Sequence, residues 1–309
     1  MRIELSFRTS NQRTTEQRNP ASTHLDSMSA VEIVRLMNSE DQNALTAVGG
    51  VAKELARAVE AVAAAFRAGG RLIYIGAGTS GRLGVLDASE CPPTFNSDPS
   101  QVVGIIAGGQ TALTRAIEGA EDSAEQGRED VQATDLASND VLVGIATSGR
   151  TPYVLGAVEY AKSLQCTTIG ISCNAGCELE QQSDIAITAV VGPEVVSGST
   201  RLKAGTATKL ILNTLTTGAM VLIGKTLGNL MVDLRATNSK LIDRTQRIVS
   251  ELTGLDPAPA VSLLSRCDGE LKTAVVAHLA DCSPSEARDL LLQAGGHLRC
   301  VLESLKNGK

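Results

Sequence analysis

The chain has 309 residues, of which 43% are hydrophobic and only 2% aromatic, with no tryptophan. This length allows one large domain and a small one, and aliphatic side chains must fill the core. With 28 basic and 34 acidic residues the net charge is −6, so the chain lacks the basic field that attracts nucleic acids and acidic membranes. We therefore expect neither a nucleic acid nor a membrane as a partner.

The first twenty residues are polar and charged, and they contain no long apolar stretch. They do not make a signal peptide, and no later segment reaches the length needed to span a membrane. We expect a cytoplasmic protein. Its seven cysteines are an odd number, which predicts free thiols in the core rather than a disulfide framework.

Two helices are expected before the first strand. A short amphipathic one covers about 30–37, where Ser29 stands at the N-cap and Glu32 at the capping-box position. A longer, Ala-rich one covers about 42–68, with apolar residues spaced by three or four, and Gly69-Gly70 ends it.

Five short apolar runs then alternate with helical patterns, at 72–76, 102–107, 141–146, 167–172 and 185–191. This alternation predicts an α/β fold with a doubly wound five-stranded parallel sheet. A ligand of such a sheet lies outside the C-terminal ends of the strands.

The rest of the chain is expected to be helical, over about 200–227 and then from Arg235 to about Leu252. Thr253 to Pro259 is interpreted as a linker because it contains Gly and Pro, and three short helical patterns follow it. The expected division is a helical arm over 1–50, a ligand-binding sheet domain over 51–252 and a small helical domain over 253–309.

The tetrapeptide Thr-Ser-Gly-Arg occurs twice, at Thr79–Arg82 and at Thr147–Arg150. Each copy follows a predicted strand, and a loop rich in hydroxyls and glycine that leads into a helix offers backbone N–H groups and a positive dipole end to a phosphate. Two simple helix caps are the structural alternative. Because the pattern occurs after two strands, we expect two anion-binding loops and a phosphorylated small molecule.

A nicotinamide dinucleotide is another possible ligand, because Gly76-Ala-Gly-Thr-Ser-Gly81 matches the G-x-G-x-x-G pattern. The acid that would bind the ribose is expected about twenty residues later. That place holds Ile105-Ile-Ala-Gly-Gly-Gln110 instead, which disfavours a dinucleotide.

Several longer strings in the chain are distinctive: Gly76-Ala-Gly-Thr-Ser-Gly-Arg82, Leu86-Asp-Ala-Ser-Glu-Cys-Pro-Pro93, Ile117-Glu-Gly-Ala-Glu-Asp122, Ala146-Thr-Ser-Gly-Arg-Thr-Pro-Tyr153, Ser199-Thr-Arg-Leu-Lys-Ala-Gly-Thr206 and Gly228-Asn-Leu-Met-Val-Asp233. Together they resemble the N-acetylmuramic acid 6-phosphate etherase family, within the sugar isomerase (SIS) superfamily. The similarity runs from about Thr15 to the C-terminus. The resemblance implies a homodimeric carbon–oxygen lyase of cell-wall recycling that cleaves the D-lactyl ether of the phosphorylated amino sugar without metal or redox cofactor.

By position, the resemblance implies an acid–base pair at Glu90 and Glu121. Expected substrate-binding residues are Gly78, Thr79, Ser80, Ser148, Gly149, Thr151 and Glu194. Ser80, Ser148 and Thr151, with nearby backbone N–H groups, are expected to hold the 6-phosphate, and Glu194 to support the sugar. The reaction that the resemblance implies is removal of the C2 proton, elimination of lactate and addition of water at C3. Glu121 is expected to act as the base and Glu90 as the acid, a division of roles that stays open.

The residues themselves give a separate argument for the two acids. Leu113, Ile117 and Glu121 are four residues apart, so a helix would place Glu121 at the edge of an apolar stripe, partly desolvated, with Glu118 toward solvent. Glu90 precedes two prolines, which would fix its carboxylate just beyond a helix. Ordinary surface or helix-terminal acids are the alternative for both.

Other chemistry and other functions are weighed against this one. Cys91 next to Glu90 suggests a nucleophile, but no histidine lies near it in the sequence, so an inert buried thiol is expected. Cys173 and Cys177 have no second pair to complete a zinc site. An SIS-type sugar-phosphate isomerase would also remove the C2 proton but would release no lactate, and a sugar-phosphate-sensing regulator would show no turnover.

The apolar stripes of 42–68 and 200–227 exceed what one sheet face covers, which favours a homodimer.

Overall fold

The computed structural model describes residues 13–234 and 239–307, and they form two compact units. The first unit takes in the described residues up to Ser89 together with Ser100–Thr216, and the second takes in Glu90–Pro99 and the described residues from Thr217 onward. The three-part domain division expected from the sequence stays a prediction.

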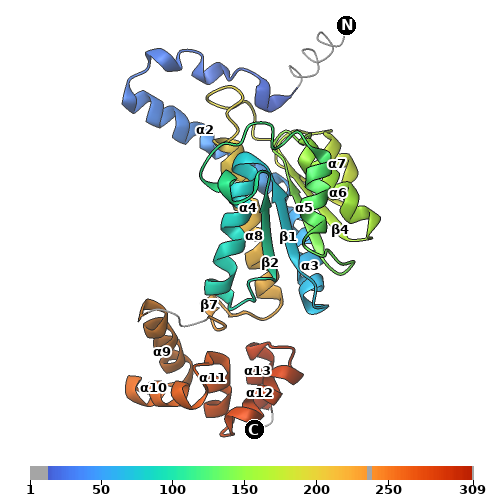
Figure 1. The fold of residues 1–309 in the computed structure, drawn as a ribbon. Helices are drawn as coiled ribbons and strands as arrows, with labels where there is room; N and C mark the ends of the chain where they lie inside the picture. Colours follow the sequence, from blue (N-terminus) through green and yellow to red (C-terminus); the bar gives the residue numbers. More distant parts are fainter. Residues whose placement is uncertain (1–12, 235–238, 308–309) are drawn as a thin grey trace. The chain divides into compact units, whose positions relative to one another are not determined.

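A five-stranded parallel sheet forms the centre of the first unit (Figure 1). Its strands are β1 (Leu72–Gly76), β2 (Val102–Ile106), β3 (Val141–Ile145), β4 (Thr167–Ser172) and β5 (Ile185–Thr188). The strand order is β2-β1-β3-β4-β5, and every neighbouring pair is parallel. The doubly wound sheet predicted from the five apolar runs is confirmed.

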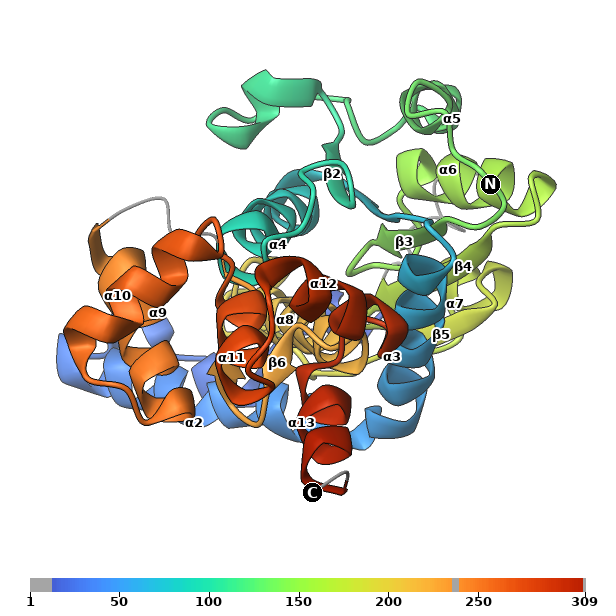
Figure 2. The same ribbon diagram turned by 90° about the horizontal axis from the view of Figure 1, so that it is seen from below.

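Helices cover both faces of this sheet, which is why β1 and β3 are buried along their whole length. Figure 2 shows α5 and α6 on one face and α3, α4 and α8 on the other. The bounds are α3 (Ala52–Arg67), α4 (Gly78–Phe95), α5 (Ala124–Gln132), α6 (Pro152–Ser163) and α8 (Lys203–Leu222), and the short α7 (Glu178–Gln182) precedes β5. No helix in the described part of the chain is long and apolar enough to cross a membrane.

Two hydrogen bonds to one buried carboxylate link β1, α4 and α8. The hydroxyl of Tyr74 in β1 donates to the Asp87 carboxylate of α4 at 2.9 Å, and the Asn213 amide of α8 donates to the same carboxylate at 2.7 Å. Because Tyr74 and Asp87 are buried, these bonds satisfy groups that would otherwise be costly to remove from water.

The N-terminal helices differ from the two expected. After three short 3-10 turns (Thr14–Glu16, Pro20–Ser22 and Leu25–Ser27), α2 runs without interruption over Ala30–Gly50. The capping box of Ser29 and Glu32 is confirmed, with the Ser29 N–H donating to Glu32 at 2.7 Å. The predicted break between 37 and 42 is wrong. The break between the two helices lies instead at Val51, after Gly49 and Gly50. Two consecutive glycines have a weaker helix propensity than residues 38–41.

The second unit is helical apart from one hairpin. The hairpin pairs β6 (Thr226–Leu227) with β7 (Leu230–Met231), and Gly228 takes a left-handed φ of 58° in its turn. The helices are α9 (Ser239–Thr253), α10 (Pro257–Arg266), α11 (Leu271–Leu279), α12 (Pro284–Gln293) and α13 (Leu298–Asn307). The expected start of α9, at Arg235, lies outside the described residues.

Two expectations for this region are wrong. Four helices follow α9 rather than three, and the predicted linker over 253–259 ends early because Pro257 opens α10 with Asp256 at its N-cap. Proline is well suited to a first helical position, where its missing N–H would have no partner. Side chains from α9 to α13 form one shared apolar core.

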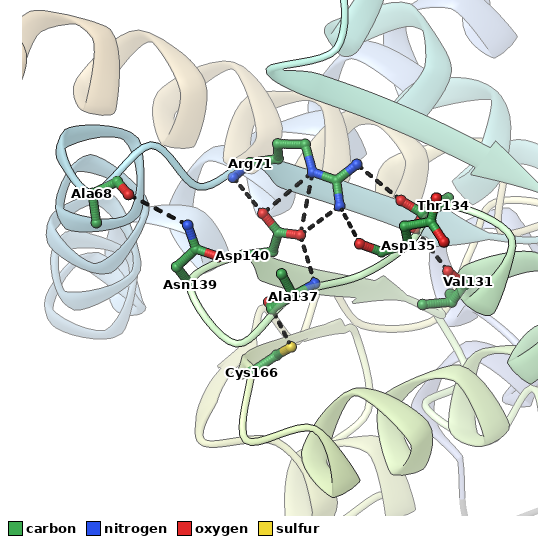
Figure 3. A network of polar contacts seen from close by, with 9 residues as sticks. All are labelled: Ala68, Arg71, Val131, Thr134, Asp135, Ala137, Asn139, Asp140 and Cys166. Carbon is green, nitrogen blue, oxygen red and sulfur yellow. Dashed lines mark hydrogen bonds and ion pairs between the residues drawn. The ribbon is translucent and has the colours of Figure 1, made fainter.

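At the N-terminal ends of β1 and β3, the partly exposed Arg71 and the buried Asp140 form a polar network (Figure 3). The Asp140 carboxylate, 2% exposed, accepts from the Arg71 backbone N–H at 2.7 Å, from its guanidinium at 2.6 Å and from the Ala137 N–H at 2.9 Å. Arg71 also donates to the carbonyls of Thr134 and Asp135. Burial disfavours the charged carboxylate, but these hydrogen bonds outweigh it and hold the pKa of Asp140 below its usual range.

Replacing Asp140 with asparagine therefore tests this network. The amide turns one acceptor into a donor that faces another donor, so we expect Asp140→Asn to lower the free energy of unfolding by about 3 kcal/mol at pH 7. Because the folded pKa is depressed, this contribution is complete above the unfolded pKa of about 4 and is lost as the pH falls through the lower folded value. Urea unfolding at a series of pH values measures the difference between wild type and variant.

Asp268→Asn is the matched control, because the Asp268 side chain is 77% exposed and pairs with Arg288 at the surface. Its expected cost is about 1 kcal/mol or less. A loss for Asp140→Asn no greater than that of the control, or a loss that persists unchanged at low pH, would show that the network is unimportant.

Candidate active site

The two Thr-Ser-Gly-Arg copies lie beside each other at one edge of the sheet. One follows β1 and the other follows β3, and these strands are direct neighbours, with Gly76 opposite Ile145 at their C-terminal ends. The chain leaves β1 for β2 on one side and reaches β3 on the other, so this is the point where the strand order reverses. Such a switch point is where open α/β sheets bind ligands.

The first copy is the first turn of a helix rather than the expected loop. α4 begins at Gly78, so Thr79, Ser80 and Gly81 lie inside it. The helix starts this early because Gly76 and Gly81 let strand and helix touch: a Cβ on Gly81 would lie 2.6 Å from the Gly76 carbonyl oxygen. The first N–H groups of a helix have no intrahelical acceptor and suit an anion.

Arg82 of this copy holds a neighbouring loop. Its Nε donates to the Leu113 carbonyl at 3.0 Å and its Nη2 to the Arg115 carbonyl at 3.1 Å. Leu113 ends the short 3-10 helix η4 (Gly109–Leu113) that follows β2. The planar guanidinium therefore ties the loop after β2 to the first turn of α4.

The second copy is a loop, as predicted. It precedes α6, whose N-cap is Thr151. The Ser148 oxygen accepts from the Arg150 N–H at 3.3 Å, and Arg150 pairs with Glu178 at 3.0 Å. Gly149 takes a φ of 68°, and a Cβ there would overlap the Cys177 side chain, so only glycine fits this turn.

A cavity of about 300 Å³ opens beside the first copy. Its walls come from the ends of β1 and β2 and from the loop after η4, and they include Gly78, Arg82, Arg115, Glu118 and Glu121. Of the residues expected at the site, Gly78 and Glu121 line this cavity together. The cavity is polar, with two arginines, two glutamates and one aspartate, Asp122, on its walls.

The local structure predicted for Glu121 is wrong. No helix joins Leu113 to Glu121: the helix ends at Leu113, Gly119 takes a φ of 70°, and Glu121 lies in a turn and is exposed. The four-residue spacing therefore makes no stripe, and Ile117 is 42% exposed. Glu118 is exposed too, and it lines the same cavity as Glu121.

The backbone of Glu121 is nevertheless fixed in place. Its carbonyl accepts from the Tyr153 N–H, in the first turn of α6, at 3.1 Å. Two glycines let α5 and α6 pack closely, because a Cβ on Gly127 would overlap the Tyr153 carbonyl and one on Gly156 the Ala124 carbonyl. Glu121 thus lies just before α5, and α5 packs tightly against α6, the helix that follows the second copy.

Glu90 lies inside α4 and not beyond its end as expected, because the helix continues through Pro92 and Pro93 to Phe95. The side chain is exposed. The prolines supply no N–H, so the helix passes through them without two of its usual hydrogen bonds. By contact, Glu90 belongs to the second unit and Glu121 to the first.

Glu194 is fully buried and caps a helix. Its two carboxylate oxygens accept from the backbone N–H groups of Lys203 at 3.1 Å and Ala204 at 2.9 Å, in the first turn of α8. Burial raises the pKa of Glu194, against the lowering effect of these two bonds. The geometry is that of a helix cap, and a contact with the sugar stays a prediction.

Three further polar residues at this edge were missed from the sequence: Thr15, Asn19 and Asn174. All three are buried. Asn174 donates to the carbonyl of Thr147, the first residue of the second copy, at 2.9 Å. Neither periodicity nor a motif marks these residues, because Thr15 and Asn174 are 159 positions apart in the chain.

The buried thiols add no reactive group to the site. All seven cysteines are free, Cys91 is 2% exposed, and burial raises the pKa of Cys173 to about 12. Within the residues that the structure describes, no three His, Cys, Asp or Glu side chains are grouped so as to hold a metal ion.

Comparison with known proteins gives the family. The family model described as the SIS domain matches residues 123–222, and that of the glucokinase regulatory protein N-terminal SIS domain matches residues 54–162. An N-acetylmuramic acid 6-phosphate etherase from Rhodopirellula baltica is 59% identical, over 94% of this chain and 97% of its own. N-acetylmuramic acid 6-phosphate etherase 2 from Vibrio parahaemolyticus is 51% identical, over 98% of this chain and 100% of its own. The chain therefore belongs to the N-acetylmuramic acid 6-phosphate etherase family and is built on an SIS domain.

Proposed function

We propose that this protein cleaves the D-lactyl ether of N-acetylmuramic acid 6-phosphate and releases D-lactate and N-acetylglucosamine 6-phosphate. Membership of the family supports the cleavage of a carbon–oxygen ether bond. The structural observation that carries the proposal is the pair of Thr-Ser-Gly-Arg segments at adjacent strand ends, the first of which borders a polar cavity that Glu121 also lines.

The phosphate is proposed to bind where these two segments meet. Ser80, Ser148 and Thr151 supply hydroxyls, and the first turns of α4 and α6 supply N–H groups and two positive dipole ends. Ser148 uses its oxygen to accept from Arg150, so its hydroxyl proton stays available to a phosphate oxygen. Binding energy from the phosphate then holds the reacting bond in place without entering the chemistry.

The reaction is proposed to be an elimination followed by addition, which makes the enzyme a lyase. An alkyl ether at C3 resists direct hydrolysis, but in the open-chain sugar the aldehyde at C1 acidifies the C2 proton. Glu121 removes that proton, and Glu90 protonates the departing lactate oxygen as the C3–O bond breaks. Glu90 then takes a proton from the water that adds to C3, and Glu121 returns a proton to C2. The position of Glu121 on the cavity wall supports its role, whereas the role of Glu90 rests on family resemblance.

D-lactate release by the purified protein tests the function directly. Lactate is expected from N-acetylmuramic acid 6-phosphate and almost none from the unphosphorylated sugar. Isomerisation of a sugar phosphate without lactate would support the isomerase alternative, and binding without turnover would support a sugar-phosphate-sensing regulator.

Ser80→Ala and Ser148→Ala test the phosphate site. Each change removes a charge-assisted hydrogen bond of about 1.5–3 kcal/mol, so each should raise KM by about tenfold or more. Initial rates of lactate release give KM and kcat. Ser163→Ala is the control, because Ser163 is exposed at the far end of α6 and donates only to the Tyr160 carbonyl. If KM is unchanged in both site variants, the phosphate binds elsewhere.

Isotopes separate the roles of the acids. In D₂O the wild type should place deuterium at C2, and in H₂¹⁸O it should place the heavy oxygen at C3 of the sugar and none in lactate. Glu121→Gln should lose exchange at C2 because the base is gone, while Glu118→Gln, altered on the same cavity wall, should retain it. Mass spectrometry of both products measures this.

Three results would contradict the assignment. Loss of exchange in Glu118→Gln alone would make Glu118 the base, and loss in Glu90→Gln alone would reverse the expected roles. Heavy oxygen in lactate would exclude elimination, because it requires cleavage on the lactyl side of the ether.

A homodimer and a cytoplasmic location also belong to the proposal. The dimer is supported by α2, which leaves Val31, Val34 and Leu45 each more than half exposed and buries only Ala44. The apolar stripe of α3, by contrast, is mostly covered within the chain, by contacts of Leu55, Val62 and Phe66 with the rest of the fold. Leu45 lies within the expected stretch 42–68, whereas Val31 and Val34 precede it. The other expected stretch, 200–227, leaves Val221 and Leu222 exposed.

A mixing experiment tests whether the two subunits share sites. Glu90→Gln and Glu121→Gln proteins, each inactive alone, are combined under conditions of subunit exchange. If each site takes its two acids from different chains, about a quarter of the wild-type sites are restored by random pairing. No recovery would mean that one chain supplies both acids, and a monomer by sedimentation would exclude shared sites.

A further inference from the structure

The segment from Arg13 to Asn19 is anchored by two buried polar residues. Thr15 is 1% exposed and Asn19 is 6% exposed, although the three residues between them are exposed. Buried polar groups in a surface segment require partners. Here the partners are Glu40 of α2 and loops at the C-terminal edge of the sheet, where the substrate is proposed to bind.

Thr15 contacts the second Thr-Ser-Gly-Arg copy through Asn174. The Asn174 Nδ2 donates to the Thr15 hydroxyl oxygen at 3.1 Å and to the Thr147 carbonyl at 2.9 Å, so both of its protons are used. In return the Thr15 N–H donates to the Asn174 Oδ1 at 3.5 Å. The Asn174 amide is thus held between the N-terminal segment and the first residue of the phosphate loop.

The same segment holds the loop between β5 and α8. The Gly198 N–H donates to the Thr15 carbonyl at 3.2 Å, and the Asn19 amide donates to the Pro193 carbonyl at 3.1 Å and to the Glu40 carboxylate at 2.7 Å. Glu40 in turn accepts from the buried Lys203 ammonium at 2.6 Å. Both ends of this loop are therefore attached to the N-terminal part of the chain.

We propose that Thr15 and Asn174 are positioning residues for phosphate recognition, and that the segment Arg13–Asn19 acts as a brace that holds the phosphate loop in its binding conformation. The inference rests on the proposed function, because it assigns the Thr147–Arg150 loop to the substrate phosphate. It adds residues that touch neither the phosphate nor the reacting bond.

The geometry explains how the brace acts. The Thr147 carbonyl accepts from Asn174 and also from the Cys173 N–H at 3.0 Å, and these two bonds fix the peptide plane that leads into Ser148. An anion site made of N–H groups and hydroxyls binds well only when they already point at the anion. Without the Thr15 hydroxyl, one buried Asn174 proton loses its acceptor, and the amide turns away from Thr147 to find another.

Thr15→Val removes this hydroxyl at nearly constant volume. Losing one neutral hydrogen bond of the brace should raise KM for N-acetylmuramic acid 6-phosphate, and weaken competition by inorganic phosphate, by about 2- to 10-fold, with kcat changed less. Thr15→Ser keeps the hydroxyl and should restore wild-type KM. Thr23→Val is the matched control, because Thr23 is exposed in the same N-terminal part and bonds only to the Pro20 carbonyl.

Asn174→Asp is a second variant should Thr15→Val not fold. It places a carboxylate oxygen against the Thr147 carbonyl and should raise KM further. A residue important only for stability would lower the melting temperature and the active fraction, and hence the apparent kcat, and would leave KM unchanged. An unchanged KM in the brace variants, or the same rise in Thr23→Val, overturns the inference.

Calorimetric binding of the phosphorylated sugar separates this inference from the proposed function. If the wild type binds the sugar but releases no lactate, the proposed reaction is wrong, and the ratio of Kd values between wild type and Thr15→Val still tests the brace. If the wild type releases lactate and the two Kd values are equal, the brace alone is wrong. If the wild type does not bind the sugar, both are wrong.

Discussion

β1 and β3 are direct neighbours in the parallel sheet, and polar groups at both ends of this strand pair determine the fold and the site. At the N-terminal ends, the Arg71 and Asp140 side chains satisfy one another and four backbone groups. At the C-terminal ends, the same two strands lead into the two Thr-Ser-Gly-Arg segments. A parallel register makes this possible, because it brings like ends of the strands to the same edge. The pair of β1 and β3 thus forms the centre of the sheet and sets the distance between the N-termini of α4 and α6.

Glycines determine how closely the surrounding helices approach this frame. Gly76 and Gly81 allow α4 to start against the end of β1, and Gly127 and Gly156 allow α5 to pack on α6 with backbone against backbone. A side chain at any of these positions would push apart elements that the site brings together. Because the interior has few aromatic side chains to fill gaps, close backbone contact takes their place in packing.

The two copies of the tetrapeptide have the same sequence and different surroundings. Arg82 binds two carbonyls of the loop after β2, which lines the cavity with Glu121, whereas Arg150 forms a half-exposed ion pair with Glu178. One copy is a helical turn and the other a glycine-centred loop. The first arginine therefore connects the proposed phosphate site to the proposed base, and the second contributes little because exposed ion pairs are weak. Identical residues acquire different roles from the strand that precedes them and from the chain that lies opposite.

The sequence by itself determined the parallel sheet, the positions of its five strands and the edge at which the two Thr-Ser-Gly-Arg segments lie, because buried strands and glycine-rich turns are encoded by neighbouring residues. It also indicated the family, through strings long enough to be specific. It did not determine the turn around Glu121, where regular spacing suggested a helix that Gly119 and the preceding loop prevent, nor the helix that passes through Pro92 and Pro93. Only the tertiary structure showed that Glu194 caps α8 and that Asn174 joins Thr15 to Thr147. Such contacts depend on residues far apart in the chain, and a buried polar side chain finds its partner only when the fold brings the two together.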